Sequence, residues 1–193
     1  MTTRFPDHSV DAQFPSRWSP RSFAADALSE AQVMSLLEAA RWAPSASNHQ
    51  PVRYAWGLRG DAGFEAIFQG LMGFNTVWAG QAAALIVVAS KPFVEKDGER
   101  AANIWHAFDA GAAWMSIALQ VQAMGLVAHA MGGFEGEKLA PALALPEGYV
   151  IHAVVAVGKQ GEAAALPEKL QARELPSPRR AVAEVAGRGK FLA

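Results

Sequence analysis

Two arginines four residues apart, with a serine between them, form the first group of side chains that could bind a charged ligand. They are Arg17 and Arg21, in the segment Arg17-Trp18-Ser19-Pro20-Arg21. A guanidinium binds phosphate oxygens through two parallel N–H donors, and a hydroxyl adds a further charge-assisted hydrogen bond. The segment therefore indicates a phosphate-ester site, although a solvated basic loop before a helix has the same pattern.

Arginine recurs near the opposite end of the chain, as the pair Arg179-Arg180. On its own, this pair is typical of an exposed basic surface. Two basic segments from the two ends of a chain can also converge on one phosphate, whose negative charge favours several cations. The sequence leaves both interpretations open, because only the fold decides whether the two segments meet.

A third segment, Pro44 to Pro51, places small and polar residues between two prolines. Small side chains allow a flat ring to lie against the backbone, and the amides of Asn48 and Gln50 offer hydrogen bonds to the edge of such a ring. The alternative is an ordinary connection from a helix to a strand, in which the same amides cap the turn.

Hydrophobic patterns predict the elements that position these segments. Ser29 and Gln32 form a capping-box pattern at the start of a helix that Pro44 stops. The alternation over 52–58 predicts a strand, and the continuous apolar run 83–89 predicts a strand buried on both faces. Further expected elements are one or two short helices at 62–80, a loop at 91–99, strands at 126–131 and 149–157, and a surface linker at 159–178.

The longest helical pattern covers residues 100–124 and is apolar on nearly every side. Such a helix is buried all round, so we expect it at the centre of the domain or at a contact between two copies of the chain. Gly125 predicts its C-terminal cap. Helices and strands are mixed without a regular βαβ repeat, and composition marks no second domain. We therefore predict a single α+β domain over residues 1–193.

The composition excludes several classes of function. The chain has 193 residues, and 17 basic against 18 acidic residues give a formal net charge of −1. This balance gives no overall attraction for nucleic acid or an anionic membrane. The lack of cysteine excludes disulfides, thiolate metal sites and iron–sulfur clusters. No signal peptide or membrane-spanning run is recognisable, so we expect a cytoplasmic protein.

The five histidines are not spaced as metal ligands, so we predict no metal site. His129 and His152 lie in strand patterns typical of core residues. His106 lies in the long helical pattern beside Trp105. It is a candidate for a cofactor or substrate pocket, with packing in the core as the alternative.

Taken together and in order, several segments resemble the FMN-dependent nitroreductase family. They are RWSPRSF at 17–23, AARWAPSASNHQP at 39–51, FNTVW at 74–78, GLVAHAMGGF at 125–134, LPEGYVIHAVVAVG at 145–158 and RRAVAEV at 179–185. No single segment is specific, whereas their order and spacing are. The resemblance implies a nitroreductase-like fold, in which helices flank a central mixed sheet and FMN lies at a homodimer interface. Residues 1–16 and 186–193 would be tails that are extended or that embrace the partner.

The resemblance assigns the phosphate end of FMN to the two basic segments. Arg17 and Ser19 would hold the phosphate and the ribityl chain, and Arg180, together with Arg179, would close on the phosphate. Trp18 stands where relatives commonly have a second basic residue, and we include it among the expected FMN contacts.

The resemblance assigns the flavin ring to residues of both subunits. Arg21 would reach the N1–O2 edge, where a cation stabilises the negative charge of the reduced flavin. Asn75 would hydrogen-bond the pyrimidine edge. The remaining expected contacts are the backbone of Gly132 and Gly133 near the reactive N5, and Pro44, Ser45, Ala46 and Asn48 in the loop that would come from the other subunit.

The activity implied by this resemblance is electron transfer from NAD(P)H to a small oxidised molecule. NAD(P)H would pass a hydride to the flavin N5 and leave before a nitroaromatic, a quinone or an activated alkene takes its place. The candidate substrate-pocket residues are His106 and Trp78, which stands where many relatives carry lysine. Alternatives are a reductive dehalogenase-type relative, a flavin-binding or storage protein without turnover, and a structural dimer that has lost FMN.

Overall fold

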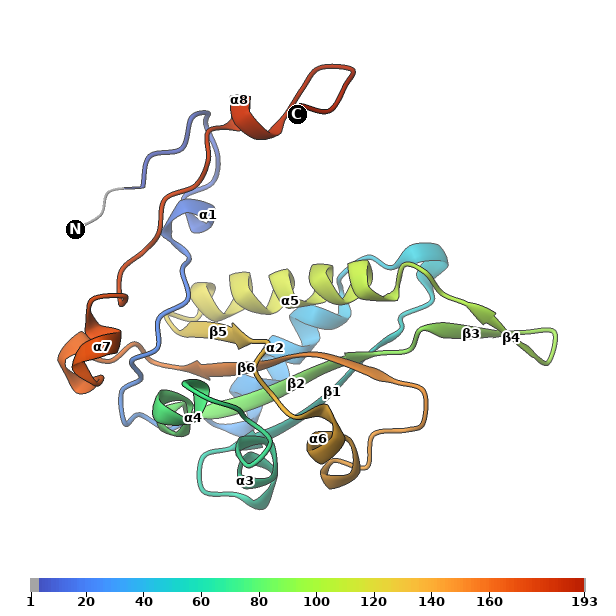
Figure 1. The fold of residues 1–193 in the computed structure, drawn as a ribbon, viewed down its shortest axis with the longest axis horizontal. Coiled ribbons are helices and arrows are strands. Elements are labelled where there is room, and N and C mark those ends of the chain that lie inside the picture. Colours follow the sequence, from blue (N-terminus) through green and yellow to red (C-terminus); the bar gives the residue numbers. More distant parts are fainter. Residues whose placement is uncertain (1–3, 193) are drawn as a thin grey trace.

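The computed structural model describes residues 4–192, which form one antiparallel sheet with helices on both faces (Figure 1). The strand order is β1-β2-β6-β5, with bounds Val52–Leu58, Ala84–Ser90, Val150–Gly158 and Val127–Met131. Every neighbouring pair of strands is antiparallel. The α+β class is thus confirmed. The strands of this one chain, however, make an antiparallel sheet and not the mixed sheet that we expected.

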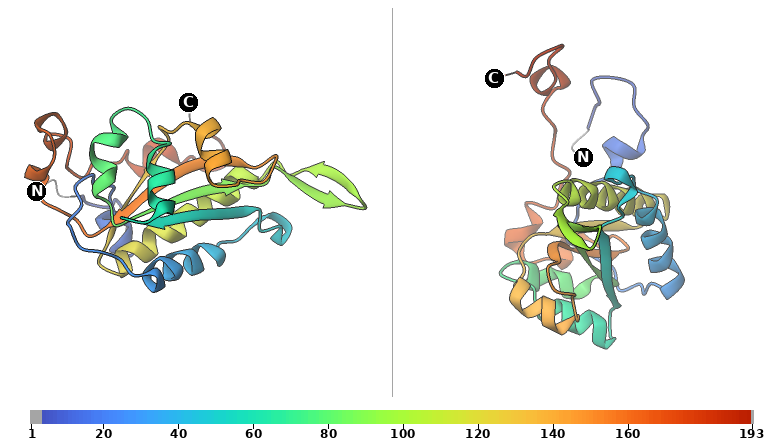
Figure 2. Two further views of the ribbon diagram at one scale, coloured as in Figure 1. Left: turned by 90° about the horizontal axis from the view of Figure 1, so that it is seen from below. Right: turned by 90° about the vertical axis from the view of Figure 1, so that its right-hand side faces the viewer.

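The helices divide between the two faces of the sheet (Figures 1 and 2). One face is covered by α2 (Glu30–Arg41) and α5 (His106–Ala123), the other by α3 (Ala62–Phe68), α4 (Asn75–Trp78) and α6 (Gly136–Ala142). β2 shows why this works, since Ile86 and Val88 pack in the core under α2 and α5, whereas Leu85 and Val87 pack in the other core. All of β2 is buried, which confirms the predicted two-sided strand.

The ends of the two longest helices follow their sequence signals. The Ser29 side chain accepts a hydrogen bond from the Gln32 N–H, and the Gln32 side chain accepts one from the Ser29 N–H at 2.9 Å. Gly125 adopts a φ of +70° after α5, and the Leu126 N–H donates to the Val121 carbonyl at 3.0 Å, which closes the helix. No helix within residues 4–192 combines the length and apolar character needed to cross a bilayer.

A β-hairpin precedes α5 and corrects two expectations, a loop at 91–99 and a helix that begins at residue 100. β3 (Phe93–Lys96) pairs with β4 (Glu99–Ala102) in a ribbon that projects from the body (Figure 2). The two turn residues, Asp97 and Gly98, have φ values of +54° and +84°. Asp-Gly is a preferred two-residue hairpin turn. This local turn chemistry outweighs the apolar residues that follow it.

The two terminal segments leave the body together and run side by side (Figure 1). Short helices interrupt them, α1 (Gln13–Ser16) in the first and α8 (Val182–Val185) in the second. The Val182 N–H donates to the Asp7 carboxylate at 2.7 Å. The segment 159–178 is more structured than the expected linker, because α7 (Glu168–Gln171) buries Leu170 in the core.

Ser90, at the end of β2, joins β6 and α5 through two histidines. Its Oγ lies 2.8 Å from His106 Nδ1 and 2.6 Å from His152 Nε2, and Ser90 is fully buried. A hydroxyl donates one proton, so one ring accepts from Ser90 and the other donates to it. Burial lowers the pKa of His152, and the neighbouring His106 lowers it further.

We predict that mild acid destabilises the protein through this network. In the unfolded chain His152 titrates near its ordinary pKa, about 6.5. Its folded-state pKa is lower, so below about pH 6.5 the unfolded chain binds more protons than the folded one. The stabilisation from neutral His152 is complete above that pH and is lost as the pH falls through the folded-state pKa. Burial lowers the pKa of His129 as well, which acts in the same direction.

Urea unfolding on either side of the ordinary histidine pKa, at about pH 7.5 and about pH 5.5, measures this loss. His152→Gln should reduce it, because glutamine keeps a polar group near Ser90 but does not titrate. His8→Gln is the matched control, since His8 is exposed. A pH dependence that stays the same in His152→Gln would contradict the prediction.

Candidate functional site

Five arginines line a cavity of about 310 Å³ where the two ends of the chain meet. Arg4, Arg17 and Arg21 come from the N-terminal segment, and Arg173 and Arg179 from the C-terminal one. The other lining residues are Trp18, Ser19, His129, Leu175 and Ser177. We call it the arginine cavity. From the sequence, the two basic segments could be separate exposed surfaces or could converge on one site, and in the structure they converge.

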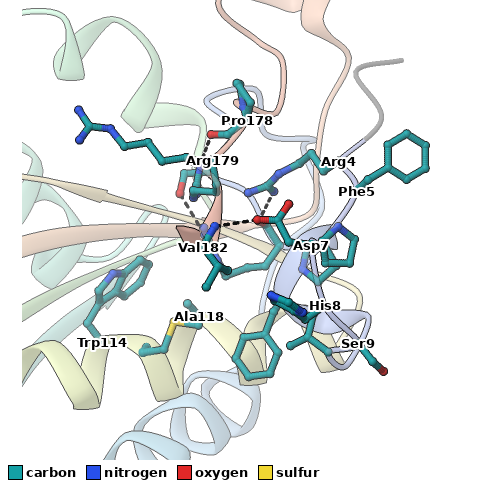
Figure 3. Close-up of a pocket in the computed structure, with 18 of the residues that line it drawn as sticks. Arg4, Phe5, Asp7, His8, Ser9, Trp114, Ala118, Pro178, Arg179 and Val182 are labelled. Carbon is teal, nitrogen blue, oxygen red and sulfur yellow. Dashed lines mark hydrogen bonds between the residues drawn. The ribbon is translucent and has the colours of Figure 1, made fainter. Parts of the chain in front are cut away.

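A larger cavity of about 940 Å³ lies between the two terminal segments and α5 (Figure 3). It shares Arg4, Arg17, Ser19 and Arg179 with the arginine cavity, so the two are continuous. We call it the tail cavity. Its remaining walls include Arg180 from the C-terminal segment and, from α5, Trp114, Met115 and Ala118.

The positive charge of the arginine cavity is largely uncompensated. Among the described residues, Arg21 is the one lining arginine that forms an ion pair, with Glu174. Burial lowers the pKa of Arg17, and the charges of Arg179 and Arg4 lower it further. Like charges this close repel one another, and an anion between them would relieve the repulsion. A phosphate group, which accepts several charge-assisted hydrogen bonds, matches this set of donors.

The segment 17–24 is fixed by the chain that follows β6. Ser22 Oγ donates to the Glu162 carbonyl at 2.6 Å, and Phe23 forms an isolated bridge with Gln160. Phe23 is also buried in the core under α3 and α6. These contacts hold the backbone directly after Arg21, and His129 Nδ1 lies 3.1 Å from the Pro20 carbonyl oxygen directly before it, so the side chains of Arg17 and Ser19 lie at a defined place at the edge of the sheet.

β5 leads from the arginine cavity to a second group of expected site residues. His129 lines the cavity, and Gly132 and Gly133 follow the strand. Asn75 Nδ2 donates to the Gly133 carbonyl at 3.0 Å, and a Cβ on Gly133 would lie 2.8 Å from that nitrogen, so the contact requires glycine. No heavy atom lies within 4 Å of a Cβ placed on Gly132. From His129 to Gly133 the chain follows β5 and two residues beyond it, a length of up to about 13 Å when extended, which suits an elongated ligand.

The loop expected to line the flavin ring lies at the opposite edge of the sheet. It leads into β1, whereas the arginine cavity borders β5, and these strands are the two edges. Three strand spacings separate them, about 14 Å. A single chain therefore does not bring the loop residues to the arginine cavity. These residues are Pro44, Ser45, Ala46 and Asn48.

This loop is held in an uncommon conformation. Ser47, Asn48 and Gln50 have φ values of +49°, +56° and +47°, in the left-handed region that non-glycine residues seldom adopt. The Ala46 N–H donates to the carboxylate of Asp109 at 3.2 Å, and Asp109 is buried at the first turn of α5. Backbone strain kept in place by buried partners is frequent at binding sites.

The two candidate substrate-pocket residues have other surroundings. Trp78 is 2% exposed, with its ring centroid 6.2 Å from that of Phe23 and 4.8 Å from that of His129. This disagrees with a place in an open pocket, because a side chain enclosed by the core offers a substrate no surface. His106 is hydrogen-bonded to Ser90, which favours the packing alternative.

Four residues at this site have no sequence signal that identifies them. Arg4 and Arg173 are single cations in irregular segments, and Glu174 is one of many carboxylates. The strand pattern marks His129 as a core residue, and it is largely buried, yet its ring also lines the arginine cavity. Its Nδ1 lies 3.1 Å from the Pro20 carbonyl oxygen. Only the fold places Arg4, Arg173 and His129 in the lining of the arginine cavity, and Glu174 beside Arg21.

Known proteins share both the sequence and the fold. The Nitroreductase family model matches residues 15–67 and 58–159. An uncharacterized 15.4 kDa protein encoded in the ask 5′ region of Mycolicibacterium smegmatis is 37% identical over 123 residues, which are 63% of this chain and 80% of that protein.

Among solved structures, an oxidoreductase containing FMN is 38% identical, with a TM-score of 0.95 over 100% of this chain and 99% of that chain. A Desulfovibrio desulfuricans structure in complex with FMN is 25% identical, with a TM-score of 0.73 over 95% of this chain and 100% of that chain. A nitroreductase family protein from Clostridium difficile 630, at 17% identity and a TM-score of 0.68 over 91% and 95% of the two chains, shares the fold. The chain therefore belongs to the nitroreductase family.

Proposed function

We propose that this protein binds FMN without a covalent bond and transfers electrons from NAD(P)H to a small oxidised molecule. The observation that supports this most directly is the convergence of Arg17, Ser19 and Arg179 on one cavity at one end of β5. A relative that covers the whole chain at 38% identity is described as containing FMN.

The donors along β5 fit the parts of FMN in order. Arg17, Ser19 and Arg179 would hold the phosphate in the arginine cavity, and Arg180 would approach from the tail cavity. Asn75, already turned toward the backbone of Gly133, would face the pyrimidine edge of the ring. The open backbone at Gly132 leaves room for a flat ring to approach.

When bound, FMN supplies the two-electron chemistry that couples NAD(P)H to an acceptor, by an exchange in which donor and acceptor use the site in turn. The chain itself contributes binding and charge. Arg21 would place a cation at the N1–O2 edge, where negative charge develops on reduction. We propose nitroaromatics, quinones or activated alkenes as acceptors, and the cytoplasm, where NAD(P)H is plentiful, as the location.

We also propose that the site is completed by a second copy of the chain. The loop that contains Ser45 and Ala46 lies about 14 Å from the β5 edge in its own chain, so it could line a flavin only in a partner. The start of α5 offers a surface for that partner, because Trp105 and Phe108 are 54% and 76% exposed. Exposed apolar patches of this kind are typical of protein contacts.

The proposed activity predicts a yellow protein whose colour responds to a nicotinamide. Under anaerobic conditions NADH or NADPH should bleach the flavin absorption band, and menadione or a nitrofuran should restore it. Stopped-flow absorbance measures both half-reactions. A protein that holds FMN but is bleached by neither nicotinamide would be a flavin-binding or storage protein, and a protein that binds no FMN would refute the proposal as a whole.

Arg17→Met should weaken FMN binding by about 10- to 100-fold, the equivalent of one charge-assisted hydrogen bond. The same change should leave the flavin-free protein as stable or more stable, by up to about 1 kcal/mol, because it relieves repulsion from Arg179 and Arg4. Fluorescence titration and urea unfolding measure the two effects. Arg188→Met, at an exposed position, should change neither. Equal loss of stability and of binding would instead indicate a structural role for Arg17.

Phe108→Glu should convert a dimer into a monomer with weaker FMN binding, because it places a charge in the apolar contact at the start of α5. Light scattering coupled to chromatography measures the mass. Ala142→Glu adds the same charge to an exposed position of α6, on the opposite face of the sheet, and should remain dimeric. A wild-type protein of single-chain mass at micromolar concentration would rule out the shared site.

A further inference from the structure

Glu174 connects the C-terminal segment to the backbone that positions Arg21. Its Oε1 accepts hydrogen bonds from the N–H of Arg21 at 2.7 Å and of Ser22 at 2.8 Å. These partners lie 153 and 152 positions earlier in the sequence. The side chain of Glu174 is 2% exposed, so one buried carboxylate fixes the turn that carries Arg21.

The second oxygen of this carboxylate is buried and has no hydrogen-bond partner. It lies 3.9 Å from a terminal nitrogen of the Arg21 guanidinium. A buried carboxylate oxygen without a donor costs free energy, and so does a buried charge without a counter-charge. Arg21, whose side chain is 20% exposed, supplies the counter-charge while still lining the cavity.

The charge of the cavity is therefore graded. Arg4, Arg17, Arg173 and Arg179 line it without an ion pair among the described residues, whereas Arg21 is partly neutralised by Glu174. The other titratable side chain that lines the cavity is His129. Burial keeps its pKa low, and this favours the neutral ring. The negative charge of Glu174 thus offsets the charge of Arg21, whereas no ion pair with a described residue offsets the charge of the other four arginines.

We propose that Glu174 is a positioning residue that fixes Arg21 and limits the positive charge which Arg21 presents to the flavin, so that the reduction potential of the bound flavin stays low. This inference rests on the proposed FMN function. The reduced flavin carries negative charge at its N1–O2 edge, so a stronger cation there would favour the reduced form. Glu174 reduces that preference because its negative charge lies beside the guanidinium.

Glu174→Gln tests this, because glutamine retains an oxygen for the two backbone N–H groups and removes the charge. Reduced FMN should bind about tenfold more tightly relative to oxidised FMN, which raises the two-electron potential by about 30 mV. Equilibration with a reference dye measures the potential, and fluorescence titration measures the affinity for oxidised FMN. Glu168→Gln, an exposed carboxylate on α7, is the matched control and should leave the potential unchanged.

A double-mutant cycle with Arg21→Met shows whether Glu174 acts through Arg21. In the Arg21→Met background, Glu174→Gln should no longer raise the potential. Glu174→Asp keeps the charge and should retain a potential close to that of the wild type, even where it lowers the melting temperature. If Glu174 had only a structural role, its substitution by Gln or Asp would change the stability of the protein and leave the reduction potential of the flavin unchanged.

Several results would overturn the inference. The first is an unchanged or lower reduction potential in Glu174→Gln. The second is a rise in potential in Glu168→Gln equal to that in Glu174→Gln. The third is a rise of the same size when Glu174→Gln is made in the Arg21→Met background. Should Glu174→Gln not fold, Arg21→Met alone decides. Loss of a compensated cation should lower the potential by less than about 30 mV, the equivalent of tenfold, and a larger drop would overturn the inference. A wild-type protein that does not bind FMN would refute the proposed function. A protein that binds FMN, with a reduction potential that does not change in Glu174→Gln, would refute only the role of Glu174.

Discussion

The repulsion between arginines gathered at one end of β5 is the constraint around which this structure is organised. Arg4, Arg17 and Arg179 come from the two ends of the chain. Burial lowers the pKa of Arg4 and of Arg17, and the charge of Arg179 lowers both further. Such a cluster is unfavourable unless the fold gains enough elsewhere to hold it. Here the gain comes from the sheet, whose central strand β2 is buried on both faces. The cluster persists because the segments on either side of it are tied to that sheet.

The geometry of the sheet also explains why the proposed site would need a second copy of the chain. The arginines of the cavity border β5, and the strained loop before β1 lies at the far edge. Asp109 fixes that loop to α5, and on the preceding residues of the same helix the aromatic side chains of Trp105 and Phe108 remain exposed. A loop held rigid by a buried carboxylate, next to an apolar surface, is suited to act in a neighbouring molecule. The two terminal segments extend past the outer face of α5 and would enlarge the same contact.

The sequence predicted most of the fold, because its strongest signals are local. The capping box at Ser29, the two-sided strand over 83–89 and the cap at Gly125 all appear near their predicted positions. The hairpin at 93–102 was missed, since apolar residues at helical spacing masked the Asp97-Gly98 turn. The antiparallel pairing of all the strands within residues 4–192 could not be foreseen either, because strand pairing depends on contacts far apart in the sequence.

The candidate site was predictable only where residues stand in a motif. Arg17, Ser19 and Arg21 do, and they lie together in the structure. Arg4 and Arg173 do not, because their roles follow from the path of two irregular segments. Trp78 shows the opposite case, because the family resemblance made it a candidate for the substrate pocket, whereas packing against Phe23 and His129 encloses the ring. Motifs thus identify the chemistry of a site, and long-range packing determines which side chains reach it.

The graded charge of the arginine cavity separates affinity from reactivity. A phosphate keeps nearly the same charge when the flavin is reduced, so an arginine beside it stabilises both redox states almost equally and contributes mainly to retention. A cation at the ring edge stabilises the reduced state more, and so changes the driving force. At Arg17 and Arg179, a charge without an ion pair would therefore increase the retention of FMN. At Arg21, a charge partly offset by Glu174 would limit the change in reduction potential. Among the described residues, Arg21 and Glu174 form the one ion pair of the cavity. With FMN bound as proposed, this pair would lie where the charge of the ligand changes during the reaction.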